Sequence, residues 1–168
     1  MTDALPEGWL PVPFGVDEGE ATALAADLSR AAAESFPGFV DGEEARSAIA
    51  RVVAQPRATS STIARVWHVL GPGATGATAD LSVAEQAGPV PDSPFPLSLP
   101  QRTWHFDAGC AVLSLVAPRE GMPMAMGLRA RRSDGSRTLI ADVLGEPAVL
   151  GLVLDDVIAL VGGARPSE

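Results

Sequence analysis

The sequence is poor in cysteine, in aromatic residues and in positive charge. Cys110 is the only cysteine among 168 residues, so no disulfide can form within the chain, which favours a reducing compartment. The N-terminal residues lack the basic and apolar segments of a secretory signal. The longest apolar run, residues 148–163, has Asp155 and Asp156 at its centre, where each carboxylate opposes insertion into a bilayer. We therefore expect a cytoplasmic protein without a membrane span.

Carboxylates outnumber cations in this chain. Twelve arginines face 21 Asp and Glu side chains, and lysine is absent, so the formal charge is −9 at pH 7. This charge repels nucleic-acid backbones and anionic lipid surfaces at long range. The 17 glycines and 15 prolines, together 32 of 168 residues, stay below the share that is typical of disordered chains. The composition predicts a single globular domain over residues 1–168 that binds neither nucleic acid nor membranes.

Hydrophobic periodicity predicts two helices near the N-terminus and one near the C-terminus. Asp17 and Glu20 have the spacing of a capping box, and Asp41 and Glu44 repeat it before a second apolar stripe. The last helix is apolar on most of its surface, which indicates deep burial or contact with another subunit. The helices are expected over residues 17–36, 41–55 and 147–161.

Alternation of side chains predicts the strands of a sheet. Residues 108–109 form either a tight turn or a bulge inside one longer strand. The strands come in antiparallel runs bracketed by helices, without regular βαβ alternation. This order predicts an α+β fold with a mostly antiparallel sheet of about five to seven strands, packed by two N-terminal helices and one C-terminal helix. The strands are expected over residues 9–14, 62–70, 77–83, 103–107, 110–116, 124–131 and 137–144.

Proline is concentrated between residues 88 and 101. A segment that lacks so many backbone donors fits neither a helix nor a central strand. We therefore predict a semi-rigid surface loop over residues 88–101. Its apolar residues Phe95, Leu97 and Leu99 can lie against the domain or, as an extended ribbon, against a partner. The prolines stand at positions 89, 91, 94, 96 and 100.

No cofactor or metal ion is expected. Gly71, Gly73 and Gly76 match the G-x-G-x-x-G spacing of a dinucleotide site, but the residues that follow alternate like a strand, so a hairpin loop is predicted instead. His68 and His105 each follow a tryptophan and lack the spacing of zinc ligands. His68 lies on an apolar face, which is typical of a hydrogen-bonded core histidine.

His105, Asp107 and Cys110 are the candidates for catalysis. Thr103, His105 and Asp107 share one face of the predicted strand, so a carboxylate is expected within reach of the imidazole, with Cys110 just beyond Gly109. Cys110 leads into an apolar strand, however, and no G-x-S-x-G nucleophile elbow is present. A buried structural cysteine is therefore favoured over a nucleophile.

Arginines gather around one predicted hairpin. Arg129, Arg131, Arg132 and Arg137 form the only positive concentration in the acidic chain. The simpler interpretation is a solvated hairpin tip. The alternative is a docking point for an acidic partner or a phosphate, because clustered guanidinium groups make bidentate contacts. These four arginines are the candidate partner-binding residues.

The order of elements resembles that of a known group of small domains. The opening Gly8-Trp9-Leu10-Pro11-Val12-Pro13, two capped helices, an antiparallel run of strands and a closing helix are similar to Mog1/PsbP-like α/β/α domains. The resemblance covers nearly the whole chain by pattern, and the Pro-rich segment departs from it. It implies a sheet between helices and a role in binding other proteins, and it transfers no functional residue.

Two functions from different classes are expected. The leading hypothesis is a non-catalytic protein-protein interaction module that presents a sheet face, the Pro-rich loop or the last helix to a protein partner or to a second copy. It rests on the absence of a convincing nucleophile, metal set or cofactor loop from the sequence. The alternative is a small enzyme or ligand-binding protein with a pocket near His105, Asp107 and Cys110.

Overall fold

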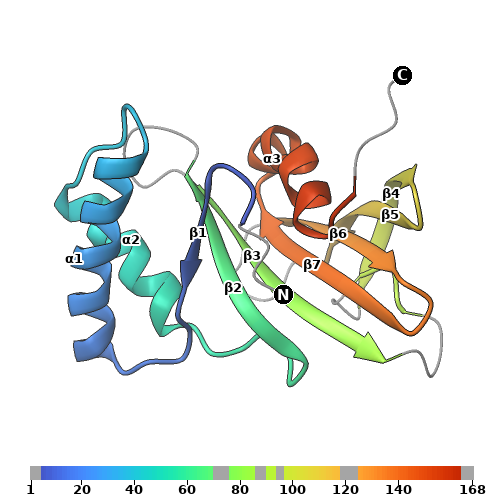
Figure 1. Ribbon diagram of the computed structural model, residues 1–168, viewed down its shortest axis with the longest axis horizontal. Coiled ribbons are helices and arrows are strands. Elements are labelled where there is room, and N and C mark those ends of the chain that lie inside the picture. Colours follow the sequence, from blue (N-terminus) through green and yellow to red (C-terminus); the bar gives the residue numbers. More distant parts are fainter. Residues whose placement is uncertain (1–4, 70–75, 86–89, 94–96, 118–124, 164–168) are drawn as a thin grey trace.

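The computed structural model describes residues 5–69, 76–85, 90–93, 97–117 and 125–163, and it has the predicted α+β class (Figure 1). Seven strands form one antiparallel sheet in the order β1-β2-β3-β7-β6-β5-β4. Three helices pack against it. The elements are β1 (Trp9–Val12), α1 (Glu18–Ser35), α2 (Glu43–Ala54), β2 (Thr62–Val69), β3 (Gly76–Glu85), β4 (Ser98–Phe106), β5 (Gly109–Val116), β6 (Ala125–Ser133), β7 (Arg137–Gly145) and α3 (Pro147–Leu160).

The two N-terminal helices start differently. The carboxylate of Asp17 accepts a hydrogen bond of 2.9 Å from the backbone N–H of Glu20, so the predicted cap of α1 is confirmed. The predicted Asp41 cap of α2 is wrong, because the N-cap residue is Gly42, without a side-chain cap. Asp41 instead accepts hydrogen bonds from Arg46 and from Ser29, which lower its pKa to about 2. Its carboxylate therefore ties α1 to the start of α2.

Helix α2 packs over β1 and β2 on one face of the sheet, and α1 lies on the side of α2 away from these strands (Figure 1). The buried side of α1 carries alanines, which allow the backbones of α1 and α2 to approach closely. Phe39, between the two helices, packs edge-on against the ring of Trp67 on β2, with ring centroids 5.7 Å apart. The buried residues of this cluster are Val12, Ala21, Ala25, Ala32, Phe39, Ala45, Ile49, Val53 and Trp67.

Helix α3 covers the other face of the sheet, which we call the α3 face. It begins with Pro147 at its first turn, as predicted, and Gly162 with a φ of +72° follows its end. It contacts β3, β6 and β7 and does not extend over β4 and β5 (Figure 1). Among the helices described, none combines the length and the hydropathy that a membrane span requires. The buried residues of α3 are Leu150, Val153, Leu154, Val157, Ile158 and Leu160.

The structure decides one point that the sequence left open, corrects the predicted bounds of the Pro-rich loop and confirms the predicted hairpin. Residues 107–108 form a tight turn between β4 and β5, in which Ala108 has a φ of +57°. The Pro-rich segment is only partly a loop, because β4 begins at Ser98 and includes Pro100. Proline fits there because an edge strand needs no donor on its outer side. Gly76 begins β3, which pairs antiparallel with β2, so a hairpin and not a helix follows the glycines; Gly71 and Gly73 lie outside the described residues.

Candidate binding surface

Strand β4 is the last strand of the sheet and has no neighbour on its outer side within the described residues. Five consecutive residues, Leu99–Thr103, are exposed, and so is His105. The opposite edge strand, β1, has only four residues and carries Pro11. An open edge presents unpaired backbone donors and acceptors to other chains. The longer and less protected edge of this sheet is therefore β4.

The pairing register fixes which backbone groups of β4 point outward. Phe106 and Gly109 are partners across the two-residue turn and form a hydrogen-bonded pair, because no pair closer to the turn exists. Pairs alternate along an antiparallel ladder, so Thr103 and His105 direct their N–H and C=O groups away from β5. A register shift between Pro100 and Arg102 interrupts the ladder. The regular part of the open edge is therefore Arg102–Phe106.

The outer strands carry apolar side chains on the α3 face, and Trp104 and Phe106 of β4 pack against the edge of the core cluster that α3 helps to form. Trp104 is half-buried, and the Arg102 guanidinium lies 4.9 Å from its ring centroid. Leu99 is 63% exposed, and Leu97, just before β4, is 74% exposed. This apolar surface continues directly to the open edge, where an added strand would extend it.

The structure brings His105 and Cys110 together but leaves Asp107 apart. His105 and Cys110 are partners in the β4–β5 register, so their side chains share a face. Cys110 is buried, and its sulfur accepts a hydrogen bond of 3.2 Å from the Nε of Arg131. Asp107 lies in the turn and is exposed, and no ion pair joins it to His105 in the described part of the chain. The expected reach of a carboxylate to the imidazole is therefore not observed.

The four arginines around the β6–β7 hairpin do not form one exposed patch. Arg129 is buried and binds Asp142 through two hydrogen bonds of 2.7 Å, and its Nη1 donates to the carbonyl of Pro91. Arg131 binds Asp92 at 2.9 Å and also donates to the carbonyl of Val90. These contacts fasten residues 90–92 of the Pro-rich segment over β6. Their proposed role toward a partner stays a prediction.

The other two arginines of this group differ from Arg129 and Arg131. Arg132 donates to the carbonyl of Gly162, just after α3, from the opposite face of β6. Arg137 is exposed at the start of β7. Arg137 is therefore the member of the group that matches the predicted solvated hairpin tip.

Two arginine–aspartate pairs form a row across the centre of the sheet. Arg65 on β2 lies opposite Asp80 on β3, Asp80 opposite Asp142 on β7, and Asp142 opposite Arg129 on β6. Each guanidinium binds its carboxylate through two hydrogen bonds. Burial, together with the adjacent Asp80, raises the pKa of Asp142, and Arg129 opposes this shift. Both carboxylates are occupied by arginine, so the row is structural.

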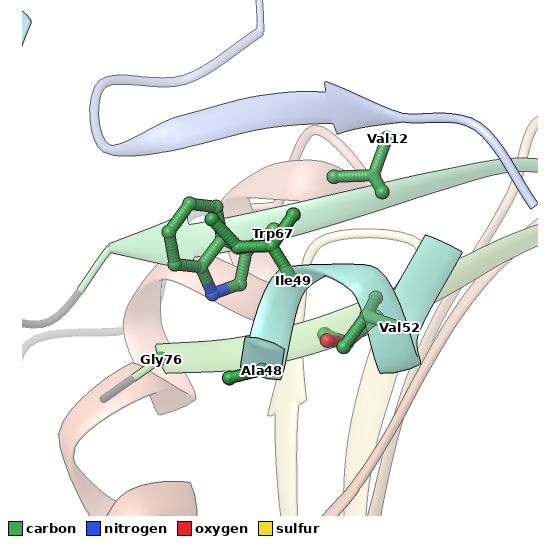
Figure 2. A pocket seen from close by; sticks show the side chains of 7 residues that line it. Val12, Ala48, Ile49, Val52, Trp67 and Gly76 are labelled. Carbon is green, nitrogen blue, oxygen red and sulfur yellow. The ribbon is translucent and has the colours of Figure 1, made fainter. Parts of the chain in front are cut away.

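A small cavity lies between α2 and the sheet (Figure 2). Its volume is about 60 Å³, well below the several hundred Å³ of a typical ligand pocket. Figure 2 shows Ile49 and Val52 of α2 on one side and Trp67 of β2 on the other, with Gly76 nearby. The cavity is suited to a few solvent molecules and does not carry a reaction. Its lining residues are Val12, Ala48, Ile49, Val52, Trp67, Gly76 and Thr78.

A larger open groove of about 860 Å³ runs along the outer side of α1 and α2. Alanine side chains such as Ala26 and Ala50 form much of its lining, and Glu18, Glu43 and Arg51 add charge. No cluster of metal-ligating side chains is found among the described residues, in this groove or elsewhere. The groove therefore offers no specific chemistry.

Comparisons with protein-family models, with curated proteins and with solved structures found no significant match. They therefore supply no site residues for this chain. The resemblance to Mog1/PsbP-like domains stays a prediction. A function is therefore inferred from the geometry of the described residues, in which the exposed edge of β4 is the candidate binding surface.

His68 makes the structure sensitive to pH. It is buried on the α3 face, with its Nε2 3.3 Å from a carboxylate oxygen of Asp156 on α3, and Trp9 packs against its ring. Burial lowers the pKa of His68 from 6.5, and Asp156 opposes this shift. The unfolded chain therefore binds a proton at higher pH than the folded chain does, so stability falls as pH drops below about 6.5.

We expect the free energy of unfolding, measured with urea, to fall between pH 7.5 and pH 5. In the variant His68→Gln the free energy of unfolding should fall less steeply over the same pH range. If the free energies of unfolding of wild type and of His68→Gln changed equally with pH, this role of His68 would be contradicted.

The open edge could not be found from sequence alone. Residues 98–101 contain Pro100 and no clean alternation, so the first half of β4 looks like a loop. The position of β4 at the edge depends on the pairing of β3 with β7, which are about sixty residues apart. The exposed Leu97 and Leu99 were the available signal, because the sequence singled them out as possible partner contacts.

Proposed function

We propose that this chain is a non-catalytic protein-protein interaction module that binds an extended segment of a protein partner along β4. In this arrangement the partner segment adds to the sheet as a further strand. Hydrogen bonds to the outward N–H and C=O groups of Thr103 and His105 supply affinity, and neighbouring side chains supply specificity. The proposal agrees with the expectation that a sheet surface is presented to a partner.

The observation that carries this proposal is the open edge of β4. Natural sheets usually protect a long edge with charges, prolines, bulges or covering segments. In β4 the proline and the register shift lie at its beginning, whereas Arg102–Phe106 is regular and carries one formal charge, on Arg102. A regular edge with unpaired backbone groups is the kind of surface to which an extended segment adds as a further strand.

Site-specific crosslinking tests the proposed surface. A photoreactive amino acid is placed at Gln101, on the open edge, and in a second variant at the exposed Arg137 as a matched control. We expect the Gln101 probe to crosslink a defined protein in the native cell, and the Arg137 probe not to do so. The crosslinked protein is then identified by mass spectrometry, purified and tested for binding.

Binding to the purified protein should depend on the backbone of β4. Thr103→Pro removes an outward N–H group, whereas Thr103→Val keeps it and changes only the side chain. We expect the proline variant to lose binding by about tenfold or more and the valine variant to keep it. Equal binding by both variants would overturn the proposed function.

A pocket at His105 and Cys110 is the second candidate function, and the contact of Arg131 with the sulfur is the observation that favours it. A catalytic cysteine must be accessible and reactive. Because Cys110 is only 8% exposed, we expect a thiol reagent to modify it slowly in the folded protein and rapidly after unfolding in urea. Rapid modification of the native protein, measured by the release of a coloured thiol product, would favour the catalytic alternative instead.

A further inference from the structure

We propose that the occupant of the β4 edge is a second copy of this chain, related by a two-fold axis at Trp104. This inference rests on the proposed function, because it names the partner that the open edge binds. In this arrangement the two β4 strands pair antiparallel, and the two sheets join into one.

The backbone of β4 is self-complementary around Trp104. The outward groups belong to Thr103 and His105, which stand symmetrically on either side of Trp104. A two-fold axis at Trp104 places Thr103 opposite His105 of the second copy, and His105 opposite Thr103. Both pairs then exchange N–H and C=O bonds, so every outward group between Arg102 and Phe106 is satisfied.

The side chains on the α3 face match in the same register. The two Trp104 rings meet at the axis in a non-hydrogen-bonded pair, the position at which cross-strand side chains approach most closely. Arg102 of each copy lies opposite Phe106 of the other. A guanidinium already rests on an aromatic ring within one copy, and the same cation–π chemistry extends across the interface.

Charge does not oppose a second copy in this register. Arg102 is the only charged residue of β4, and Asp107 follows directly in the turn. In the antiparallel pair, Arg102 lies opposite Phe106 of the other copy and Asp107 lies opposite Gln101, so no like charges face each other across the two strands.

The acidic part of the molecule lies far from this edge. Residues 17–54, which contain α1 and α2, carry eight carboxylates and three arginines. Figure 1 shows α1 and α2 at one end of the longest axis and β4 with β5 at the other. Pairing through β4 therefore keeps the most acidic regions of two copies apart, although each chain has a net charge of −9. An interface through the helices would bring these charges together.

The ends of the regular segment limit the ladder to five residues. The register shift between Pro100 and Arg102 stops it on one side, and the turn at Asp107 stops it on the other. A ladder of this length supports a dimer that depends on concentration, because it buries less surface than an obligate interface does.

Sedimentation of the full chain tests the dimer. We expect wild type to change from monomer to dimer between micromolar and millimolar concentrations, and Thr103→Val to behave in the same way. Thr103→Pro should weaken the dimer by about tenfold or more, because one N–H bond is lost in each copy. Circular dichroism and the melting temperature establish that each variant is folded.

A charge swap tests the register itself. Thr103 and His105 are both exposed and lie directly opposite each other in the proposed register. The variant Thr103→Arg, His105→Arg places like charges opposite each other across the interface and should weaken the dimer by roughly fivefold to tenfold, whereas Thr103→Arg, His105→Glu places opposite charges there and should not weaken it. A difference between the two variants is specific to this register, because only this register puts residue 103 of one copy opposite residue 105 of the other.

The outcomes separate this inference from the proposed function. A chain that stays monomeric at millimolar concentration, while Thr103→Pro abolishes binding to a different crosslinked protein, overturns the second copy and leaves the β4 surface standing. If neither Thr103→Pro nor the charge swap changes the dissociation constant of the dimer, the proposed register is wrong, and β4 is also contradicted as the binding surface. A dimer that responds to both supports the two proposals together.

Discussion

Replacing Arg65 with alanine should lower the free energy of unfolding by about 3–5 kcal/mol, because the change leaves buried acceptors without their donor. The Arg65 side chain is only 3% exposed. It binds both carboxylate oxygens of Asp80 and donates to three carbonyl groups at the end of α2. Its removal therefore leaves the Asp80 charge uncompensated and separates α2 from β2. The three carbonyls belong to Val52, Gln55 and Pro56.

Urea unfolding measures this loss. Arg30→Ala is the matched control, because Arg30 pairs with Asp27 on the surface of α1 and is 60% exposed, so its removal should cost less than about 0.5 kcal/mol. The double variant Arg65→Met, Asp80→Leu removes both charges together and should recover the part of the loss that comes from the uncompensated Asp80 charge, while the three carbonyl groups still lack their donor. A cost below about 1 kcal/mol for Arg65→Ala would show that the pair does not hold α2 to the sheet.

Gly76→Ala should be the next most damaging change, with a loss of about 1–3 kcal/mol or more. A Cβ atom at Gly76 would overlap the indole nitrogen of Trp67 and lie 2.5 Å from the carbonyl oxygen of His68. The indole is rigid and the carbonyl belongs to the paired strand, so neither can move without disturbing the β2–β3 hairpin. The added methyl group therefore strains the wall of the cavity under α2.

Gly151→Ala is the same chemical change, but it is expected to raise the free energy of unfolding instead of lowering it. Gly151 lies within α3, is exposed, and has open space where a Cβ would stand. Alanine there should raise the free energy of unfolding by about 0.5–1 kcal/mol, because glycine inside a helix is unfavourable. Thermal melting of the two variants, side by side with wild type, checks both predictions. Destabilisation by both would mean that the packing around Gly76 is not the cause.

Local signals in the sequence were sufficient for most elements. The Asp17 cap, the Pro147 start of α3 and the alternation in β6 and β7 each depend on residues that are close in the chain. Such signals need no knowledge of the tertiary structure. The α+β class followed from their order, and the structure confirms it.

Long-range contacts decided what the sequence could not show. Asp41 has the spacing of a cap, but Ser29 and Arg46 attract its carboxylate away from the helix start. The predicted arginine cluster at the hairpin tip includes Arg129, whose partner Asp142 is on the neighbouring strand and whose second contact is the Pro-rich segment. In both cases a polar side chain joins elements that are adjacent only after folding.

The order of the strands also says how the fold is assembled. The strands β1 to β3 and the meander β4 to β7 are each built from neighbours in the chain, and only the pairing of β3 with β7 joins the two groups. Two further contacts accompany this pairing. Helix α3 contacts both β3 and β7 on one face of the sheet, and Asp80 and Asp142 lie side by side on the other face. Pairing of β3 with β7 brings together residues far apart in sequence, so its cost in chain entropy makes it the slow step of folding. We therefore expect the group β1 to β3 and the group β4 to β7 to form their secondary structure early, and to become one cooperative unit only when β3 pairs with β7.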